Sequence, residues 1–227
     1  MGEEVKLFTT WSSPYGLRVI WALNLKGIQY QTLDENILQK SSSLLKYNPV
    51  YKKVPVLVHN GKPISESLFI LEYLDETWKD QYLLLPQHPH DRARARFWAK
   101  FGDDKVLQTI AFGIVGKEGK EQEEAVCEAR ENLKYVEEEL KGNKFFGGDQ
   151  IGIVDLALGW LGYYIAVFEE VVGFKIIDQQ KFPFLTEWMK EFASLPFIKE
   201  TWPPFRKLVA RFVEFRKSHL LKAKSNI

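Results

Sequence analysis

The spacing of hydrophobic positions changes several times within the first half of the chain. Val5–Thr10 alternates apolar and polar side chains, which is typical of a half-buried strand, and Gly16–Lys26 then has helical spacing. Gly27 follows as a suitable helix C-cap. Ile28–Asp34 is rich in branched and aromatic residues and predicts a second strand. These segments together predict a β-α-β unit.

A hairpin and another helix are predicted next, after an irregular, lysine-bearing segment at 37–47. Asn60-Gly61 suits the two positive φ angles of a type I′ turn, so Val54–His59 and Lys62–Ile64 should pair antiparallel. Pro63 lacks an amide hydrogen and must avoid a central position in the sheet. From residue 65 to about residue 78, apolar side chains at helical spacing predict an amphipathic helix.

The remainder of the chain predicts a connection followed by helices alone. Residues 79–91 contain two prolines and show neither the alternation of a strand nor the repeat of a helix. The residues at 155–172 are apolar nearly all round, which indicates a helix buried inside a bundle. The sequence therefore predicts a thioredoxin-like α/β domain at 1–80, a linker at 81–91 and an all-helical domain at 92–227. Long helices are expected at 92–115, 121–140, 155–172, 183–194 and 203–221.

Composition narrows the classes of function. The 227 residues are 45% hydrophobic, enough for a sizeable core, and Lys plus Arg exceed Asp plus Glu by only one. This net charge favours neither nucleic acid nor an anionic membrane surface, so a small-molecule partner is expected. No segment resembles a secretory signal or is apolar for long enough to span a bilayer, which predicts a cytoplasmic protein. Cys127 is the only cysteine and the four histidines are scattered, so no metal site is expected.

Ser13 lies between the first strand and the first helix. Because Pro14 follows it, Ser13 should have an extended backbone and act as the helix N-cap, and capping alone is one interpretation. Its hydroxyl hydrogen would still be free to bind an anion at the positive end of the helix. A thiolate bound there would be stabilised, which lowers the pKa of its thiol from about 8.5. Ser12, one residue earlier, is the second choice.

Two further segments could bind a ligand through their backbone or polar side chains. If the Val54-Pro55 bond is cis, Val54 turns its backbone groups outward to pair with an extended peptide; an ordinary trans proline is the more frequent alternative. Ser65, Glu66 and Ser67 open a helix, which is either a plain serine cap or a receptor for the carboxylate and ammonium of an amino-acid head group.

Other polar residues have simpler interpretations. Lys40 and Lys53 could hold a second carboxylate, although each alone is usually solvated. Asp155 is expected to bond back to the backbone of Gly152 and start a helix, a role in folding. Cys127 lies beside the apolar stripe of its helix and is expected to be an inert or weakly reactive thiol.

Seven short stretches have the order and spacing of one known family. They are Trp11–Val19 with its Ser-Pro pair, Asn48-Pro49 with Lys53–Leu57, Glu66–Tyr73, Leu85-Pro86, Arg92–Trp98 and Gly152–Leu158. Together they resemble the plant tau class of glutathione transferases, and the resemblance covers nearly the whole chain. It implies a homodimer and glutathione as a co-substrate, with no other cofactor.

The resemblance also implies roles for individual residues. Ser13 would be the catalytic serine that donates to the glutathione sulfur, and Val54 would pair with the cysteinyl unit through a cis Pro55. Glu66 and Ser67 would hold the γ-glutamyl end. Lys40 and Lys53 would hold the glycine carboxylate. Tyr15 stands where the family more often has phenylalanine, at the edge of the acceptor pocket. The other residues expected to bind the acceptor are Leu107, Ala111, Ile114, Tyr163, Leu208 and Phe212.

Three functions remain to be compared. The first is conjugation of the glutathione thiolate to hydrophobic electrophiles, with peroxides as further acceptors, in detoxification or the stress response. The second is a carrier that binds apolar metabolites in the same pocket without turnover. A thiol oxidoreductase is disfavoured because residues 11–16 contain no cysteine that could form a mixed disulfide.

Overall fold

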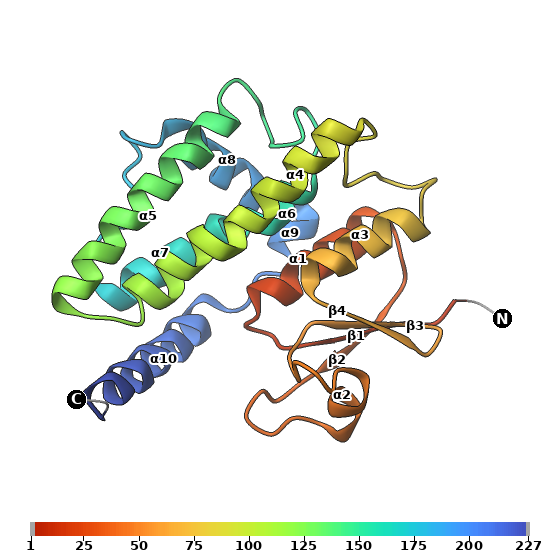
Figure 1. The fold of residues 1–227 in the computed structure, drawn as a ribbon, viewed down its shortest axis with the longest axis horizontal. Helices are drawn as coiled ribbons and strands as arrows, with labels where there is room; N and C mark the ends of the chain where they lie inside the picture. The colour runs from red at the N-terminus through yellow and green to blue at the C-terminus, as the bar shows by residue number, and fades with distance from the viewer. Residues whose placement is uncertain (1–2, 226–227) are drawn as a thin grey trace. The chain divides into compact units, whose positions relative to one another are not determined.

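The computed structural model describes residues 3–225, and the chain divides into two compact units, Met1–Ala95 and Arg96–Ile227 (Figure 1). The first unit holds a four-stranded sheet with helices. The described residues of the second unit form helices and two isolated bridges. The predicted fold class, a thioredoxin-like α/β part followed by an all-helical part, is confirmed.

The sheet of the first unit is mixed and has the strand order β2-β1-β3-β4. β1 (Val5–Thr9) pairs parallel with β2 (Gln31–Asp34) and antiparallel with β3 (Val56–His59). β4 (Lys62–Ser65) pairs antiparallel with β3 and forms one edge of the sheet, where Pro63 does not interrupt a central ladder.

The turn between β3 and β4 has the predicted conformation. Asn60 and Gly61 have φ angles of 49° and 77°, the positive values that a type I′ turn requires. The hairpin prediction is therefore confirmed.

Three helices belong to the first unit, and serine side chains cap two of them. α1 (Pro14–Leu25) is capped by Ser13, and α2 (Ser42–Tyr47) by Ser41, whose side chain accepts from the amide of Leu44 at 3.0 Å. The sequence predicted an irregular segment at 37–47 that could include a helix, in the order β-α-β-(α)-β-β-α, and α2 is that helix. α3 (Ser67–Thr77) packs against α1.

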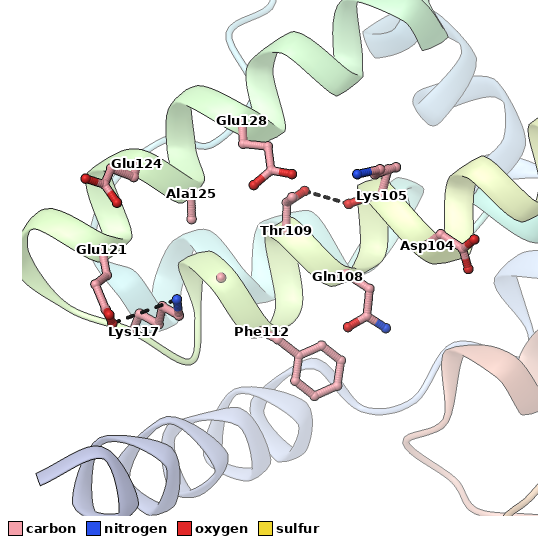
Figure 2. A pocket seen from close by; sticks show the side chains of 11 residues that line it. Asp104, Lys105, Gln108, Thr109, Phe112, Lys117, Glu121, Glu124, Ala125 and Glu128 are labelled. Atoms are coloured by element: carbon pink, nitrogen blue, oxygen red, sulfur yellow. Dashed lines mark hydrogen bonds and ion pairs between the residues drawn. The ribbon is translucent and has the colours of Figure 1, made fainter. Parts of the chain in front are cut away.

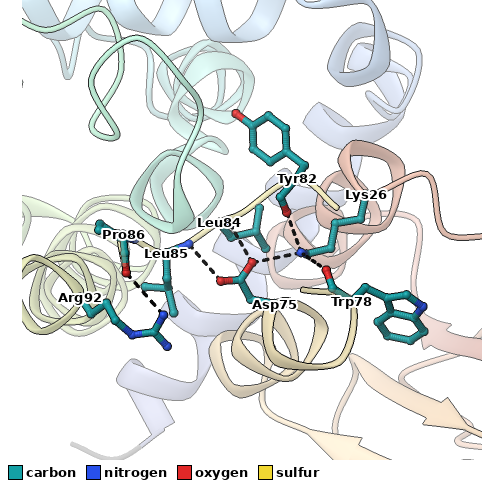
Figure 3. Close-up of polar contacts among 8 residues, drawn as sticks. All are labelled: Lys26, Asp75, Trp78, Tyr82, Leu84, Leu85, Pro86 and Arg92. Carbon is teal, nitrogen blue, oxygen red and sulfur yellow. Dashed lines mark hydrogen bonds and ion pairs between the residues drawn. The ribbon is translucent and has the colours of Figure 1, made fainter. Parts of the chain in front are cut away.

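A buried ion pair fixes the segment that follows α3 (Figure 3). Lys26 Nζ lies 3.0 Å from Asp75 Oδ1, and the two side chains are 0% and 4% exposed. Lys26 also donates to the carbonyl oxygens of Trp78 and Tyr82 at 3.3 and 2.6 Å. The backbone amides of residues 84–85 donate to the Asp75 carboxylate at 2.8 and 3.2 Å. Because every charge has several partners, this pair is fully satisfied and holds part of the predicted linker against α1 and α3.

The helices of the second part of the chain differ from the prediction in three places. The helix expected to begin at Arg92 begins at Pro89 and becomes a π-helix at Gly102. The helix expected over 155–172 is interrupted at Gly159 and Trp160. A short helix, α9, follows α8. The elements are α4 (Pro89–Phe101), η1 (Gly102–Ile114), α5 (Gly119–Leu140), α6 (Ile153–Leu158), α7 (Leu161–Val172), α8 (Pro183–Ser194), α9 (Pro196–Lys199) and α10 (Phe205–Ser225).

The π-helix η1 follows an unusual apolar pattern. Buried pairs at 106–107, 110–111 and 114–115 recur every four residues, a longer repeat than the 3.6 of an α-helix. Two glycines let neighbouring helices come close. A Cβ on Gly113 would lie 2.9 Å from the Cβ of Ala125, and one on Gly102 would lie 2.8 Å from Leu158 Cδ2.

Asp155, in the first turn of α6, joins three segments of the second unit. Its fully buried carboxylate accepts from the Gly152 amide at 2.8 Å, as predicted, and from the Trp188 indole N–H at 2.8 Å. The amides of residues 146 and 147 donate to it at 3.0 and 3.3 Å. Burial raises the pKa of Asp155 to about 6, and the four donated hydrogen bonds oppose this rise.

Candidate active site

The sheet topology brings four predicted site segments to one edge. β1 and β2 are parallel, so both end at this edge, while β3 begins and β4 ends there. One row of register partners crosses three strands, Phe8 to Val56 to Ser65. The segments 10–13, 35–41, 54–55 and 66–67 therefore all leave or enter the sheet at the same end.

Ser13 has the predicted N-cap geometry. Its backbone is extended, with φ −89° and ψ 115°, and its Oγ accepts from the Gly16 amide at 3.1 Å. Accepting this bond leaves the hydroxyl hydrogen available to a ligand at the N-terminus of α1. Gly16 is required here because a Cβ at this position would lie 2.0 Å from Thr9 Oγ1. The close approach of α1 to β1 sets the position of the serine.

Arg18 links two of the predicted site segments. This side chain is 0% exposed, and its Nη1 donates to Ser67 Oγ at 3.2 Å. The guanidinium carbon also lies 5.1 Å from the centre of the Tyr15 ring. Sequence reasoning gave Arg18 little weight. Arg18 stands among the apolar positions of α1 that are buried, and a charged residue at such a position needs a specific partner. This feature of the sequence could have identified Arg18.

Glu66 precedes α3 in a left-handed backbone conformation. Its φ is 70°, and its side chain makes no capping hydrogen bond. The alternative of a plain serine cap at Ser65 is therefore wrong, because Glu66 holds the N-cap position. Ser67 is the buried first residue of α3. A glutamate with positive φ stores strain, which is a feature of functional sites.

The Val54-Pro55 peptide bond is cis, so the more frequent trans alternative is wrong. Asn48, which is 4% exposed, supports the segment before it. Its Nδ2 donates to the Lys53 carbonyl at 3.0 Å, and its Oδ1 accepts from the Tyr51 amide at 3.2 Å. Sequence reasoning assigned no role to Asn48.

Two exposed lysines flank this edge of the sheet. Neither Lys40 nor Lys53 forms an ion pair with a residue in the described range 3–225. The buried Glu35 holds the loop next to Lys40 by accepting from the Ser41 hydroxyl at 2.5 Å and from its amide at 3.1 Å. Both ammonium groups are thus available to a ligand carboxylate.

The residues predicted to bind the acceptor in the second unit are mostly part of its core. Leu107, Ala111 and Ile114 are buried on η1, as is Leu208 on α10. Phe212, also on α10, packs on Tyr164 and Phe168, with ring centres 6.0 and 4.8 Å apart.

Tyr163 is held in place by contacts with the segment that precedes α10. Its hydroxyl donates to the carbonyl of Pro203 at 2.9 Å, and its ring stacks on Trp202 at 4.8 Å. Sequence reasoning did not select Phe112, which is 44% exposed and lies 5.7 Å from the ring of Phe215. Phe112 lies outside the buried apolar positions of η1, and an aromatic residue at such a position was the sequence feature that could have pointed to it.

A hollow of about 390 Å³ lies between η1 and α5 (Figure 2). Its walls are mainly charged and include an ion pair between Lys117 and Glu121 at 3.8 Å. Thr109, also in the wall, donates to the carbonyl of Lys105 at 2.8 Å. A charged lining does not suit an apolar electrophile, so this hollow is not the acceptor site.

Residues 3–225 hold neither of two other kinds of feature, a metal-binding cluster or a membrane-spanning helix. No group of three or more His, Cys, Asp or Glu side chains in this range could hold a metal ion. None of the helices there is sufficiently long and apolar to cross a membrane.

Comparison with protein-family models assigns both parts of the chain. Residues 3–76 match the model described as "Glutathione S-transferase, N-terminal domain", and residues 94–196 match "Glutathione S-transferase, C-terminal domain". The chain therefore belongs to the glutathione S-transferase family.

Individual relatives narrow the assignment. The chain is 48% identical over 210 residues to a probable glutathione S-transferase of Glycine max, covering 92% of this chain and 93% of that protein. It is 48% identical over 209 residues to glutathione S-transferase U8 of Arabidopsis thaliana, with the same coverage.

Solved structures agree with these relatives. The tau-class glutathione S-transferase of mango, Mangifera indica, has a TM-score of 0.86 at 40% identity, covering 95% of this chain and 98% of that one. Rice GST1 in complex with glutathione has a TM-score of 0.88 at 32% identity, with 96% and 98% coverage. Within its family the chain is a tau-class enzyme with glutathione S-transferase activity, which confirms the resemblance and the predicted function.

Proposed function

We propose that Ser13 activates glutathione by donating its hydroxyl hydrogen to the sulfur. The observation that supports this is the capping geometry, in which Ser13 Oγ accepts from the Gly16 amide at 3.1 Å and retains its own hydrogen. The sulfur would lie at the N-terminus of α1, where the helix dipole also favours a negative charge. Both interactions favour the thiolate, which is the nucleophilic form of a thiol.

The rest of the tripeptide is proposed to lie along the same edge of the sheet. Val54 pairs its backbone with the cysteinyl unit. Glu66 accepts from the γ-glutamyl ammonium, and Ser67, held by Arg18, donates to the neighbouring carboxylate. The arrangement is supported by the convergence of these segments at the ends of β1, β3 and β4.

The far end of glutathione is proposed to meet the two lysines. Lys40 and Lys53 are exposed and have no ion-pair partner among the described residues, so they can bind the glycine carboxylate. Their contribution should weaken with salt, because both ammonium groups face solvent.

In the proposed reaction the thiolate attacks a hydrophobic electrophile. A carbon–sulfur bond forms, the leaving group departs with its electron pair, and the thiol proton passes to solvent. Tyr15 and side chains of η1, α7 and α10 are proposed to bind the acceptor. They are Leu107, Ala111, Ile114, Tyr163, Leu208 and Phe212. Rate then comes from holding the two reactants together as well as from ionising the thiol.

The enzyme is also proposed to act as a homodimer in the cytoplasm. An aromatic patch on α4 and α5 supports the dimer, since Phe97 and Tyr135 are 60% and 62% exposed. The reducing cytoplasm agrees with a chain whose single cysteine, Cys127, is exposed and free.

The test replaces Ser13 with alanine and uses Ser12→Ala as the matched control. Ser13→Ala is expected to lower kcat for conjugation of chlorodinitrobenzene by about a hundredfold, because one preorganised donor is lost. The pKa of bound glutathione, followed by thiolate absorbance, should rise toward about 8.5. Ser12→Ala should leave both values close to those of the unmodified enzyme.

Two results would contradict the assignment of Ser13. One is an unchanged rate and thiol pKa in Ser13→Ala. The other is an equal loss in both variants, which would indicate a general disturbance of the loop.

A further inference from the structure

The last helix, α10, contacts its neighbours along one side. Leu208, Phe212, Phe215 and His219 recur at steps of three and four residues, and Arg216 comes four residues after Phe212. Residues at these spacings lie on the same side of a helix. The basic Arg216 therefore shares a side with apolar and aromatic residues, where it needs a specific partner.

Apolar packing on α7 fixes the first half of α10. Leu208 is buried, and the ring of Phe212 lies 4.8 Å from that of Phe168 and 6.0 Å from that of Tyr164. Side chains packed into a core in this way allow little movement. The start of α10 therefore has a defined position relative to α7.

The second half of α10 meets η1 through long side chains. Phe215 and His219 lie 5.7 and 6.3 Å from the ring of Phe112, which is 44% exposed. The helix packs on η1 less closely than on α7. An aromatic contact at the surface holds the two helices together only weakly, so a further contact is needed to fix their separation.

Arg216 supplies that contact at the end of η1. Its Nη1 donates to the carbonyls of Val115 and Lys117 at 2.8 and 2.6 Å and lies 3.4 Å from the carbonyl of Ile114. η1 ends at Ile114, and the last carbonyls of a helix have no partner within it. The guanidinium thus provides charged donors at the negative end of the η1 dipole.

Stability of the helix pair is the simplest role for this contact, but its location suggests a second one. η1 and α10 carry most of the residues proposed to bind the acceptor, namely Leu107, Ala111, Ile114, Leu208 and Phe212. One of the carbonyls near Arg216 belongs to Ile114, and Phe212 lies one helical turn before Arg216. The contact therefore ties together the two groups of side chains between which the acceptor is proposed to bind.

We propose that Arg216 is a positioning residue that sets the width of the acceptor site. By holding α10 at a fixed separation from η1, it lets a small apolar acceptor touch both helices and disfavours a bulky one. Arg216 does not reach the reacting atoms, so it leaves the activation of the thiol unchanged. This inference rests on the proposed acceptor residues and is independent of the role of Ser13.

Amide hydrogen exchange of the full chain tests the contact without any acceptor. Arg216→Gln loses the charge and three of the five N–H donors. Exchange should become about tenfold faster in α10 beyond residue 212 and stay unchanged at 205–211, where packing on α7 persists. Lys217→Gln removes the same charge from the next, exposed position and should exchange like the unmodified enzyme.

Conjugation kinetics test the consequence for the acceptor. Arg216→Gln should raise KM for chlorodinitrobenzene about tenfold at a similar kcat, because the binding-competent arrangement of α10 is less populated. KM for glutathione and the pKa of its bound thiol should not change, which shows that the variant has folded. Arg216→Lys keeps a charged donor and should give an intermediate KM.

The length of the acceptor reports the width of the site directly. With a series of n-alkyl isothiocyanates, kcat/KM of the unmodified enzyme is expected to fall as the chain lengthens beyond what the site holds. In Arg216→Gln this fall should be shallower, whereas Lys217→Gln should follow the unmodified enzyme. An identical dependence on chain length in Arg216→Gln would overturn the proposal.

Phe212→Leu separates this proposal from that of the acceptor site. It keeps an apolar side chain and leaves Arg216 in place, so a changed KM for the acceptor would support α10 as part of the site. If Phe212→Leu changes this KM and Arg216→Gln does not, Arg216 does not set the width and only the acceptor residues stand. If neither changes it, the proposed acceptor residues are wrong and the role of Arg216 falls with them.

Three other results would overturn the role of Arg216. Unchanged exchange in Arg216→Gln would show that the contact does not hold α10. Equal effects in Lys217→Gln would indicate a general influence of charge. A rise in KM for glutathione as large as that for the acceptor would indicate a general loss of structure.

Discussion

The backbone conformation of Glu66 costs stability, whereas its carboxylate is proposed to bind glutathione. Its φ of 70° is one that glycine adopts readily and glutamate does not. Such a conformation costs on the order of 1–3 kcal/mol and persists only where the surrounding structure requires it. Here β4 on one side and α3 on the other determine where the chain must turn. The carboxylate is thereby presented at the edge of the sheet, where glutathione is proposed to bind.

Replacing Glu66 with glycine should separate stability from binding. Glu66→Gly is expected to leave the free energy of unfolding unchanged or to raise it by up to about 1 kcal/mol, because the relief of strain exceeds the extra entropy of the unfolded chain. KM for glutathione should rise about tenfold or more, since a charged hydrogen bond is lost. Urea unfolding and steady-state kinetics measure the two quantities.

Glu66→Ala is the control for this experiment. It loses the same carboxylate but keeps the strained backbone, so KM should rise equally while stability does not increase. A glycine variant that is clearly less stable than the alanine variant would show that the conformation of Glu66 is not strained.

At the scale of elements, Asp155 holds α6, α8 and the loop at 146–147 together through four donated hydrogen bonds. Because burial raises its pKa from 3.8 to about 6, the folded protein retains this proton more tightly than the unfolded chain does. The contribution of Asp155 to stability is therefore greatest below about pH 4 and is lost as pH rises through about 6.

Asp155→Asn is expected to reveal this linkage. An amide offers one acceptor oxygen to four donors, so the variant should lose about 3 kcal/mol of unfolding free energy at neutral pH. The difference from the unmodified protein should be larger at about pH 3, below both pKa values, where the carboxyl group is protonated in both states. Urea titrations at several pH values measure it. Asp149→Asn, at an exposed position in the same region, serves as control, and a difference independent of pH would contradict the raised pKa.

The helices η1 and α10 show how an element depends on its neighbours. The sequence predicts both as helices, but it does not show the change from α-helix to π-helix at Gly102, where the chain also comes close to Leu158 of α6. The orientation of α10 likewise depends on contacts of Phe215 and Arg216 with η1. Element types could be predicted from the local pattern. These interactions could not, because they join residues of different helices, and Arg216 lies 101 positions from Val115 in the sequence.

At the scale of the whole molecule, the proposed dimer needs a self-complementary surface. Phe97, Trp98 and Phe101 on α4 contact one another, and Phe101 lies 6.3 Å from Tyr135 on α5. Large exposed aromatic groups of this kind are uncommon on a monomer and are frequent anchors of protein interfaces.

Phe97→Asp is expected to weaken the dimer by about thirtyfold or more, because it removes an anchor and places a charge in an apolar contact. Sedimentation velocity over a range of concentrations measures this directly. Phe174→Asp, at a phenylalanine that is 37% exposed elsewhere in the second unit, should remain dimeric. A fully dimeric Phe97→Asp would exclude this patch as the interface.

Much of the geometry at the proposed glutathione site could be predicted from the sequence, and the exceptions have a common cause. Ser13 was identified because its neighbour Pro14 fixes a local cap, and local rules apply to it. Arg18, Asn48 and the φ of Glu66 were missed because their roles appear only when β1, β3 and β4 bring separate segments together. The acceptor residues stay a prediction, since most of those named are also core residues.

The sequence alone determined the strands and most of the long helices, where Ser13 caps α1, how Asn60-Gly61 turns the hairpin, and to which family the chain is similar. These features depend on residue type and short-range spacing. The tertiary structure decided the cis bond before Pro55, the partners of the buried Lys26, Asp75 and Asp155, and which side of α10 faces outward. The physical reason is that burial and long-range hydrogen bonding depend on which distant segments meet, and no local pattern contains that information.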